Sequence, residues 1–272
     1  MKSKFPLLLI AVLATTLINY LQAQTQDSIS EFEPLFVTVN TLHVVADANF
    51  DELKKLEQEY FDKVISNNDL ILNHETLIEQ TDSSVIKVKF INIFSNWDDI
   101  RNSETVNEIL IARNWPYASE RKLYFEKQND LYSNFHSDQI YLTTELIKNI
   151  SDNTAEETPN LVRVDTSILA DASDDNAYEK YVSYVENVIY KNPLLHSYQP
   201  IRQYWGGDSR EFVEIFILNS GVTFEEFGQK NKELYEKFIP NTAEREEFLK
   251  VMQGAVESHS SGFYKSMSSL SK

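Results

Sequence analysis

The octapeptide VISNNDLI, at Val64–Ile71, returns 124 residues later as VIYKNPLL, at Val188–Leu195. The register slips further along, where WDDI at 97–100 matches FEEF at 224–227, because the second copy carries a longer turn at 221–223. The original offset is then restored in a match between two sets of four residues: Pro116, Glu120, Arg121 and Tyr124 against Pro240, Glu244, Arg245 and Phe248. An insertion that is compensated within one copy is typical of a tandem duplication, since chance matches would not return to register.

Each copy is predicted to begin with a strand and a helix. Residues 36–44 are rich in strand-forming residues, and a helix is predicted to start near Asn49. Its apolar residues Leu53, Leu56, Tyr60 and Val64 fall on one stripe, at the spacing of a helix that faces a sheet. Residues 178–189 repeat this stripe in the second copy.

Two strands are predicted to follow in each copy. In the first copy they span 75–80 and 84–94, joined by a turn through Asp82 and Ser83. In the second they span 199–205 and 210–218, joined by a turn at 206–208 where Gly206 and Gly207 supply positive φ. Strands joined by so short a turn must be antiparallel.

Two further helices and a last strand are predicted to complete each copy. One helix opens at Asn96 or Thr223, where a capping side chain precedes paired acids, and another follows Pro116 or Pro240. The final strand is predicted at 136–142 in the first copy and at 259–265 in the second. The expected order is therefore β-α-β-β-α-α-β, twice.

This order resembles the ferredoxin-like βαββαβ unit and, more narrowly, the dimeric α+β barrel superfamily. Members of that superfamily include antibiotic-biosynthesis-type monooxygenases, haem-degrading monooxygenases and chlorite dismutases. The resemblance implies an α+β fold in which two tandem ferredoxin-like βαββα(α)β units close into an intramolecular α+β barrel. It also implies, for an enzyme, cofactor-independent or haem-linked oxidation. No catalytic motif of a member matches residue for residue, so no functional residue is carried over.

The ends and boundaries of the units follow from composition. Residues 1–23 combine a basic start, an apolar run and Ala23, which predicts a cleaved signal peptide, with an uncleaved N-terminal anchor as the alternative. Residues 24–33 are then an N-terminal linker, 34–144 the first barrel half, 145–160 a polar linker and 161–272 the second half. The expected location is secreted or periplasmic.

Composition excludes several function classes. A formal net charge of −17 repels phosphate backbones and anionic lipids, so nucleic-acid and membrane partners are not expected. The chain has no cysteine, so it has no disulfide, lipid-anchor cysteine or thiol chemistry. Its six glycines form no phosphate-binding loop, and no histidines stand at metal-ligand spacing, so no metal site is predicted.

His136 and His259 occupy matching positions, each followed by a serine. At a helix-to-strand junction such an imidazole could act as a general base or a haem ligand at the barrel mouth. It could instead cap the preceding helix and bond a backbone carbonyl. The structural interpretation is favoured, because both halves keep the residue while an active site needs only one.

A ligand site is instead expected where the second copy gains charge. At the plain 124 offset Arg202 replaces Ile78, Arg163 replaces Val39, Asp165 replaces Thr41 and Glu214 replaces Phe90. An inward-pointing Arg202 could hold a ligand carboxylate or pair with Glu214, with Tyr204 as part of a stacking wall. The alternative is that these charged side chains point to solvent.

The leading functional expectation is a small apolar or aromatic ligand bound inside the barrel. One alternative is a non-catalytic interaction or structural module of the cell envelope, with the barrel filled by side chains; another is a monooxygenase-like or haem-linked enzyme. Whether a cofactor is used stays open. A monomer is expected, because both sheets close on each other within one chain.

Overall fold

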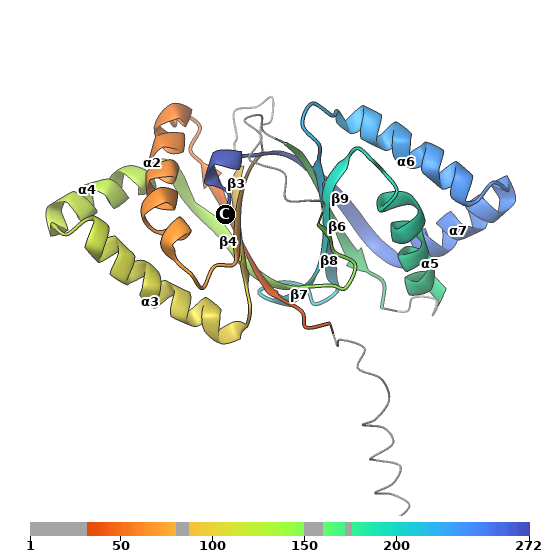
Figure 1. The fold of residues 1–272 in the computed structure, drawn as a ribbon, viewed down its shortest axis with the longest axis horizontal. Coiled ribbons are helices and arrows are strands. Elements are labelled where there is room, and N and C mark those ends of the chain that lie inside the picture. The colour runs from red at the N-terminus through yellow and green to blue at the C-terminus, as the bar shows by residue number, and fades with distance from the viewer. Residues whose placement is uncertain (1–31, 80–86, 150–159, 172–175) are drawn as a thin grey trace, which may run out of the picture. The chain divides into compact units, whose positions relative to one another are not determined.

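A computed structural model describes residues 32–79, 87–149, 160–171 and 176–272. Residues Pro34–Lys272 form one compact unit (Figure 1). The expected signal peptide, the turn at Asp82 and Ser83 and most of the linker between the halves lie outside the described residues. Within the described part, no helix is long and apolar enough to cross a membrane.

The predicted element order is confirmed in both halves. The first half contains β1 (Phe36–Val44), α2 (Phe50–Lys63), β2 (Asn73–Glu79), β3 (Lys87–Phe94), α3 (Trp97–Asn114), α4 (Ala118–Asn129) and β4 (Tyr132–Thr143). A short strand, β5 (Lys148–Asn149), follows. The second half contains β6 (Leu161–Leu169), α5 (Asn176–Tyr184), a π-helical turn (Val185–Ile189), β7 (Leu195–Trp205), β8 (Glu211–Leu218), α6 (Phe224–Phe238), α7 (Thr242–Gly254) and β9 (Val256–Ser266).

The strands of both halves form one closed antiparallel circuit. The first half has the order β4-β1-β3-β2 and the second has the equivalent order β9-β6-β8-β7. One seam joins β2 to β9, with Leu77 opposite Ser266, and the other joins β4 to β7, with Leu142 opposite Arg202. Figure 1 shows the barrel between α2, α3 and α4 on one side and α5, α6 and α7 on the other. The fold is therefore the expected intramolecular α+β barrel.

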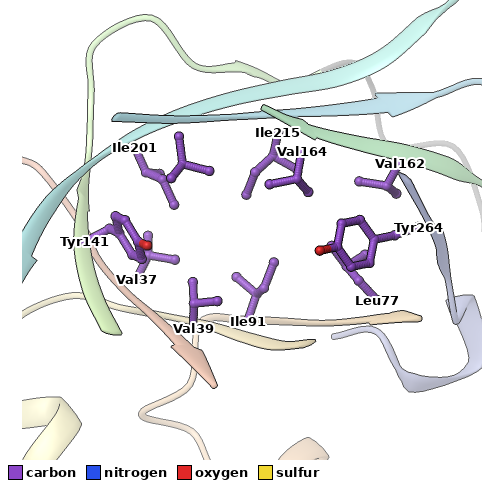
Figure 2. Close-up of a cluster of buried hydrophobic side chains, with 11 residues drawn as sticks. Val37, Val39, Leu77, Ile91, Tyr141, Val162, Val164, Ile201, Ile215 and Tyr264 are labelled. Atoms are coloured by element: carbon purple, nitrogen blue, oxygen red, sulfur yellow. The ribbon is translucent and has the colours of Figure 1, made fainter. Parts of the chain in front are cut away.

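Side chains alternate between the barrel interior and the space under the helices. Val37, Val39, Ile91, Val164, Ile201 and Ile215 belong to a buried cluster that converges on the barrel axis (Figure 2). Residues of opposite parity pack against the helices instead, around Leu53 in the first half and Tyr198 in the second. This strict alternation follows from the two-residue period of a strand, and it decides which face each candidate residue occupies.

The predicted helix starts are confirmed by their caps. The Asn49 side chain accepts hydrogen bonds from the backbone N–H groups of Asp51 and Glu52, so α2 begins where the sequence indicates. At the start of α6, Thr223 and Glu226 bond each other's backbone N–H groups in a capping box.

Candidate functional site

Arg202 and Tyr204 lie on the outer face of β7, because Ile201 and Gln203 take the inward positions. Both Arg202 and Tyr204 are exposed, and the Tyr204 ring contacts the ring of Phe36 at a centroid distance of 5.4 Å. The expectation that Arg202 points into a cavity and pairs with Glu214 is therefore wrong. Apolar and polar residues do not alternate regularly in β7 around Pro200, so the sequence does not show which face of the strand Arg202 occupies.

Arg163 and Asp165 also face outward. The first strands of the two halves, β1 and β6, have equivalent positions 125 residues apart, rather than the 124 assumed from the repeat. Asn40 lies opposite Phe90 in the first half, and Asp165 lies opposite Glu214 in the second. Asp165 thus corresponds to Asn40, and Arg163 to Thr38 rather than to the inward-facing Val39. A one-residue slip moves every side chain of a strand to the other face.

These charges form a network under α5. Arg163 donates to both carboxylate oxygens of Asp165, with N–O distances of 2.7 Å each, and the Ser261 hydroxyl donates to Asp165 at 2.7 Å. Glu214 accepts hydrogen bonds from the hydroxyls of Tyr198 at 2.5 Å and Tyr181 at 3.2 Å.

Burial raises the pKa of Glu214 to about 7, and the facing carboxylate of Asp165 adds to the shift. The hydrogen bonds from the two tyrosines oppose this shift, as does the nearby guanidinium of Arg163. Two carboxyl groups thus lie opposite each other under the helices rather than inside the barrel.

His136 and His259 lie within strands, not at helix-to-strand junctions. His136 is exposed, with Nε2 3.3 Å from Asp138, while His259 lies within hydrogen-bond distance of the hydroxyls of Ser167 and Ser261. The capping interpretation is wrong, because the backbone N–H groups of Asp130 and Ala255 close α4 and α7. Neither histidine lines either of the two cavities described below.

The larger of these cavities, about 340 Å³, lies between the outer face of the first-half sheet and its helices. Helix α2 contributes Glu57 and α4 contributes Gln128, while β2 and β3 contribute His74 and Asn92. Aromatic rings form much of its wall: Tyr60, Phe61, Phe90, Phe125 and Tyr132. A cavity of this size is at the lower end of the range for small-molecule sites.

Glu57 is the only acidic residue among the described residues that line this cavity. Its side chain is buried, and Oε1 accepts hydrogen bonds from Gln128 Nε2 at 2.9 Å and from the Tyr132 hydroxyl at 2.8 Å. Burial raises the pKa of Glu57, although both hydrogen bonds oppose the shift. The same described lining contains no lysine or arginine, so no cation there offsets the desolvation of the carboxylate.

His74 lines the same cavity, and burial favours its neutral form. Nδ1 lies 2.6 Å from Asn92 Oδ1, and Nε2 lies 3.0 Å from the Thr76 hydroxyl. Burial lowers the pKa of His74, and nearby Lys272 adds to this. The neutral ring therefore donates from Nδ1 and accepts at Nε2, and it stacks on Phe90 with an interplanar angle of 23°.

This site was not expected from the sequence, although the sequence contains a signal for it. Glu57 falls between Leu53 and Tyr60 on the apolar stripe of α2, where an acid must be buried if the stripe faces the sheet. His74 and Asn92 occupy outward positions of β2 and β3; the helices that cover this face leave His74 buried and Asn92 half-buried.

No protein-family profile matches this chain, and no curated protein matches it with significance. Solved structures are similar in fold. A candidate monooxygenase from Fusobacterium nucleatum is 7% identical and superposes with a TM-score of 0.55, over 87% of this chain and 94% of that one. A candidate monooxygenase from Lactobacillus acidophilus is 12% identical with a TM-score of 0.52, over 86% and 94%. The fold-level resemblance to dimeric α+β barrel proteins is thereby confirmed.

Haem, which the resemblance raised, does not fit the described lining of the larger cavity. His74 is the only histidine in that lining, and both of its ring nitrogens are already engaged. Haem iron needs an axial ligand, and its propionates favour cationic partners. Without a free imidazole nitrogen or a lysine or arginine in that lining, we assign no haem to it.

Proposed function

We propose that this chain binds a small, neutral, largely apolar molecule that carries a weakly acidic hydroxyl group, in the cavity around Glu57. The observation that carries the proposal is a buried carboxyl with no cationic partner among the described residues that line a 340 Å³ aromatic cavity. A negatively charged ligand would add a second uncompensated charge, so a neutral ligand fits better.

Glu57 acts as the proton acceptor in this proposal. Its Oε1 is held by Gln128 and Tyr132, which fixes the orientation of the carboxyl group. Burial brings its pKa closer to that of a phenolic hydroxyl, and this makes proton exchange with the ligand less unfavourable. Phe90 and Phe125 line the cavity and supply aromatic surface for the ligand to pack against.

A monooxygenase-like reaction is the catalytic form of the proposal. After Glu57 accepts the hydroxyl proton, the electron-rich ligand anion would react with dioxygen at a ring carbon. The C–H bond at that carbon breaks and a C=O bond forms, so the ligand is oxidised to a quinone. The second oxygen atom leaves as water with the two hydrogens that the ligand has lost. Its support is a fold shared with two candidate monooxygenases, together with a carboxyl that can accept the proton. A non-catalytic binding protein is the alternative.

The proposed site differs from the expected one. The barrel axis is occupied by apolar side chains, and the described cavity inside it is about 110 Å³, too small for an aromatic ligand of ordinary size (Figure 2). We therefore move the ligand from the barrel interior to the space between helices and sheet. The secreted or periplasmic location stays part of the proposal, and N-terminal sequencing of the exported protein, with Gln24 as the expected first residue, tests it.

Chromogenic phenols test the proposal directly. A nitrophenol that binds beside the ionised form of Glu57 should show the absorbance of its phenolate, because Glu57, whose pKa is raised by burial, accepts its proton. Glu57→Gln should abolish this spectral change, and Phe125→Ala should weaken binding about tenfold. Glu126→Gln is the matched control, because that carboxylate is exposed on α4.

Two results would overturn the proposal. One is an unchanged phenolate signal in Glu57→Gln, and the other is a wild-type protein that binds no phenol in a broad screen. If the protein binds a phenol and accepts its proton, oxygen consumption with the same ligand then shows whether the protein is an enzyme or a non-catalytic binding protein.

A further inference from the structure

A second, smaller cavity lies inside the barrel, between two opposite charges. Its volume is about 110 Å³, and Lys89 of β3 and Glu211 of β8 both line it. These two strands are diametrically opposite in the closed circuit, because four steps separate them in either direction. Ile91 and Ile215 lie on facing walls (Figure 2), and the lining also includes the polar side chains of Gln139, Tyr141 and Thr166.

Lys89 points into the barrel and is partly buried. Its ammonium donates a hydrogen bond to the Thr41 hydroxyl at 3.0 Å, and burial lowers its pKa, with neighbouring Lys87 adding to the effect. Lys87 itself pairs with Glu79 at 3.0 Å. Lys89 forms no ion pair within 4.0 Å among the described residues, although Glu79 and Glu211 both act on it at longer range.

Glu211 faces Lys89 across the cavity. Its Oε1 accepts hydrogen bonds from the Tyr141 hydroxyl and from Gln139 Nε2. These are neutral donors, and no lysine or arginine lies within ion-pair distance of Glu211 in the part of the chain that the structure describes. Two partly desolvated charges of opposite sign thus remain apart, which is unfavourable unless something polar lies between them.

We propose that this interior cavity binds a small zwitterion, an amino acid of the size of glycine or alanine. Its carboxylate would lie toward Lys89 and its ammonium group toward Glu211, so one molecule neutralises both partly buried charges. The volume corresponds to about four water molecules at the roughly 30 Å³ that each takes in the liquid, so it suits a molecule no larger than glycine or alanine. An anion alone would satisfy Lys89 but face the carboxylate of Glu211, and a cation alone would face Lys89.

Calorimetric titration of the full chain tests the proposal with defined probes. Glycine and L-alanine should bind, while acetate and methylamine, which carry one charge each, should bind at least about tenfold more weakly. L-Leucine should not bind, because its side chain exceeds the cavity. These comparisons separate a zwitterion site from a simple anion or cation site.

Variants assign the binding to the two charges. Lys89→Met and Glu211→Gln should each weaken glycine binding by about tenfold or more. Lys87→Met is the matched control, since that neighbouring inward lysine pairs with Glu79 and does not line the cavity. Glu211→Gln is nearly isosteric and its amide oxygen still accepts from Tyr141, so it tests the site even if Lys89→Met fails to fold.

Three outcomes would overturn the proposal. The first is no binding of glycine or alanine up to roughly 10 mM, which corresponds to a negligible affinity. The second is acetate binding as tightly as glycine, which would define an anion site. The third is unchanged glycine binding in the folded Glu211→Gln protein. None of these outcomes depends on the cavity around Glu57.

Discussion

Asn68 and Asn192, 124 residues apart, make equivalent contacts in the two halves of the barrel. Each side-chain amide donates to a second asparagine on the following helix, Asn107 at 2.8 Å and Asn231 at 2.7 Å. Each side-chain oxygen also accepts the backbone N–H two residues on, at 3.1 and 2.9 Å. Both asparagines have an exposed fraction of 0%. The repeated octapeptide thus preserves a buried hydrogen-bonding residue that ties a turn to a helix.

The first prediction is that Asn68→Ala and Asn192→Ala destabilise the protein to a similar extent. Each substitution leaves several buried polar groups without a partner, which should lower the free energy of unfolding by about 2–4 kcal/mol. Asn67→Ala is the control within the same octapeptide, because Asn67 is exposed and should cost less than about 1 kcal/mol. Urea unfolding measures all three. Equal losses for Asn67 and Asn68 would contradict the interpretation.

The order of strands and helices could be predicted because local signals and the repeat agree. Asn49, Asn96 and Thr223 cap helices where the sequence places them, and Gly206 adopts a positive φ of 95° in the predicted turn. Such features depend on neighbouring residues along the chain. The duplication adds independent support, because each half predicts the other.

The candidate site could not be placed, because it depends on strand faces and on packing between distant elements. Equivalent positions of β1 and β6 are 125 residues apart, one more than in the repeated octapeptide, and this difference places Arg163 on the outer face of the barrel. No local sequence pattern reveals this change of register. The cavity around Glu57 requires α2 and α4 to cover the same sheet face, with Gln128 brought to Glu57 across 71 positions. Sequence periodicity carries no information about such a contact.

The second prediction compares the loss of stability when each of two glycines, Gly206 and Gly221, is replaced by alanine. Gly206 and Gly221 both have positive φ, 95° and 78°, so alanine is strained at each by about 1 kcal/mol. A Cβ at Gly206 would also lie 2.7 Å from the backbone oxygen of Asp138 in β4, whereas at Gly221 nothing lies within 4 Å. Gly206→Ala should therefore cost about 2–4 kcal/mol and Gly221→Ala about 1. Denaturant unfolding that gives equal losses would argue against the close approach of this turn to β4.

The third prediction is that the protein is a monomer. Both seams of the barrel, β2–β9 and β4–β7, close within one chain, so no second chain is needed to complete the circuit. Light scattering should give no more than the 31.6 kDa of a single full-length chain. A stable species of twice that mass at micromolar concentration would contradict the prediction.

The fourth prediction concerns pH and Glu214. The folded-state pKa of this carboxyl is raised to about 7 from an ordinary value of 4.5, chiefly by burial. Between these two values the folded protein holds a proton that the unfolded chain has released, so the free energy of unfolding falls as the pH rises through this window. Below the window Glu214 is protonated in both states, and above it Glu214 is ionised in both. The groups facing Glu214 are Tyr181, Tyr198, Asp165 and Arg163.

Glu214→Gln removes the titrating proton while keeping an oxygen that can accept from Tyr198. The variant should therefore gain stability relative to the wild type between pH 5 and pH 8, by an amount on the order of 2 kcal/mol once the partial exposure of Glu214 is allowed for. Urea unfolding of both proteins at the two pH values measures the difference. Glu225→Gln, an exposed acid at the start of α6, serves as the control and should shift the difference far less. A wild-type protein that loses no stability relative to Glu214→Gln over this range would show that the carboxyl ionises as readily in the folded protein as in the unfolded chain.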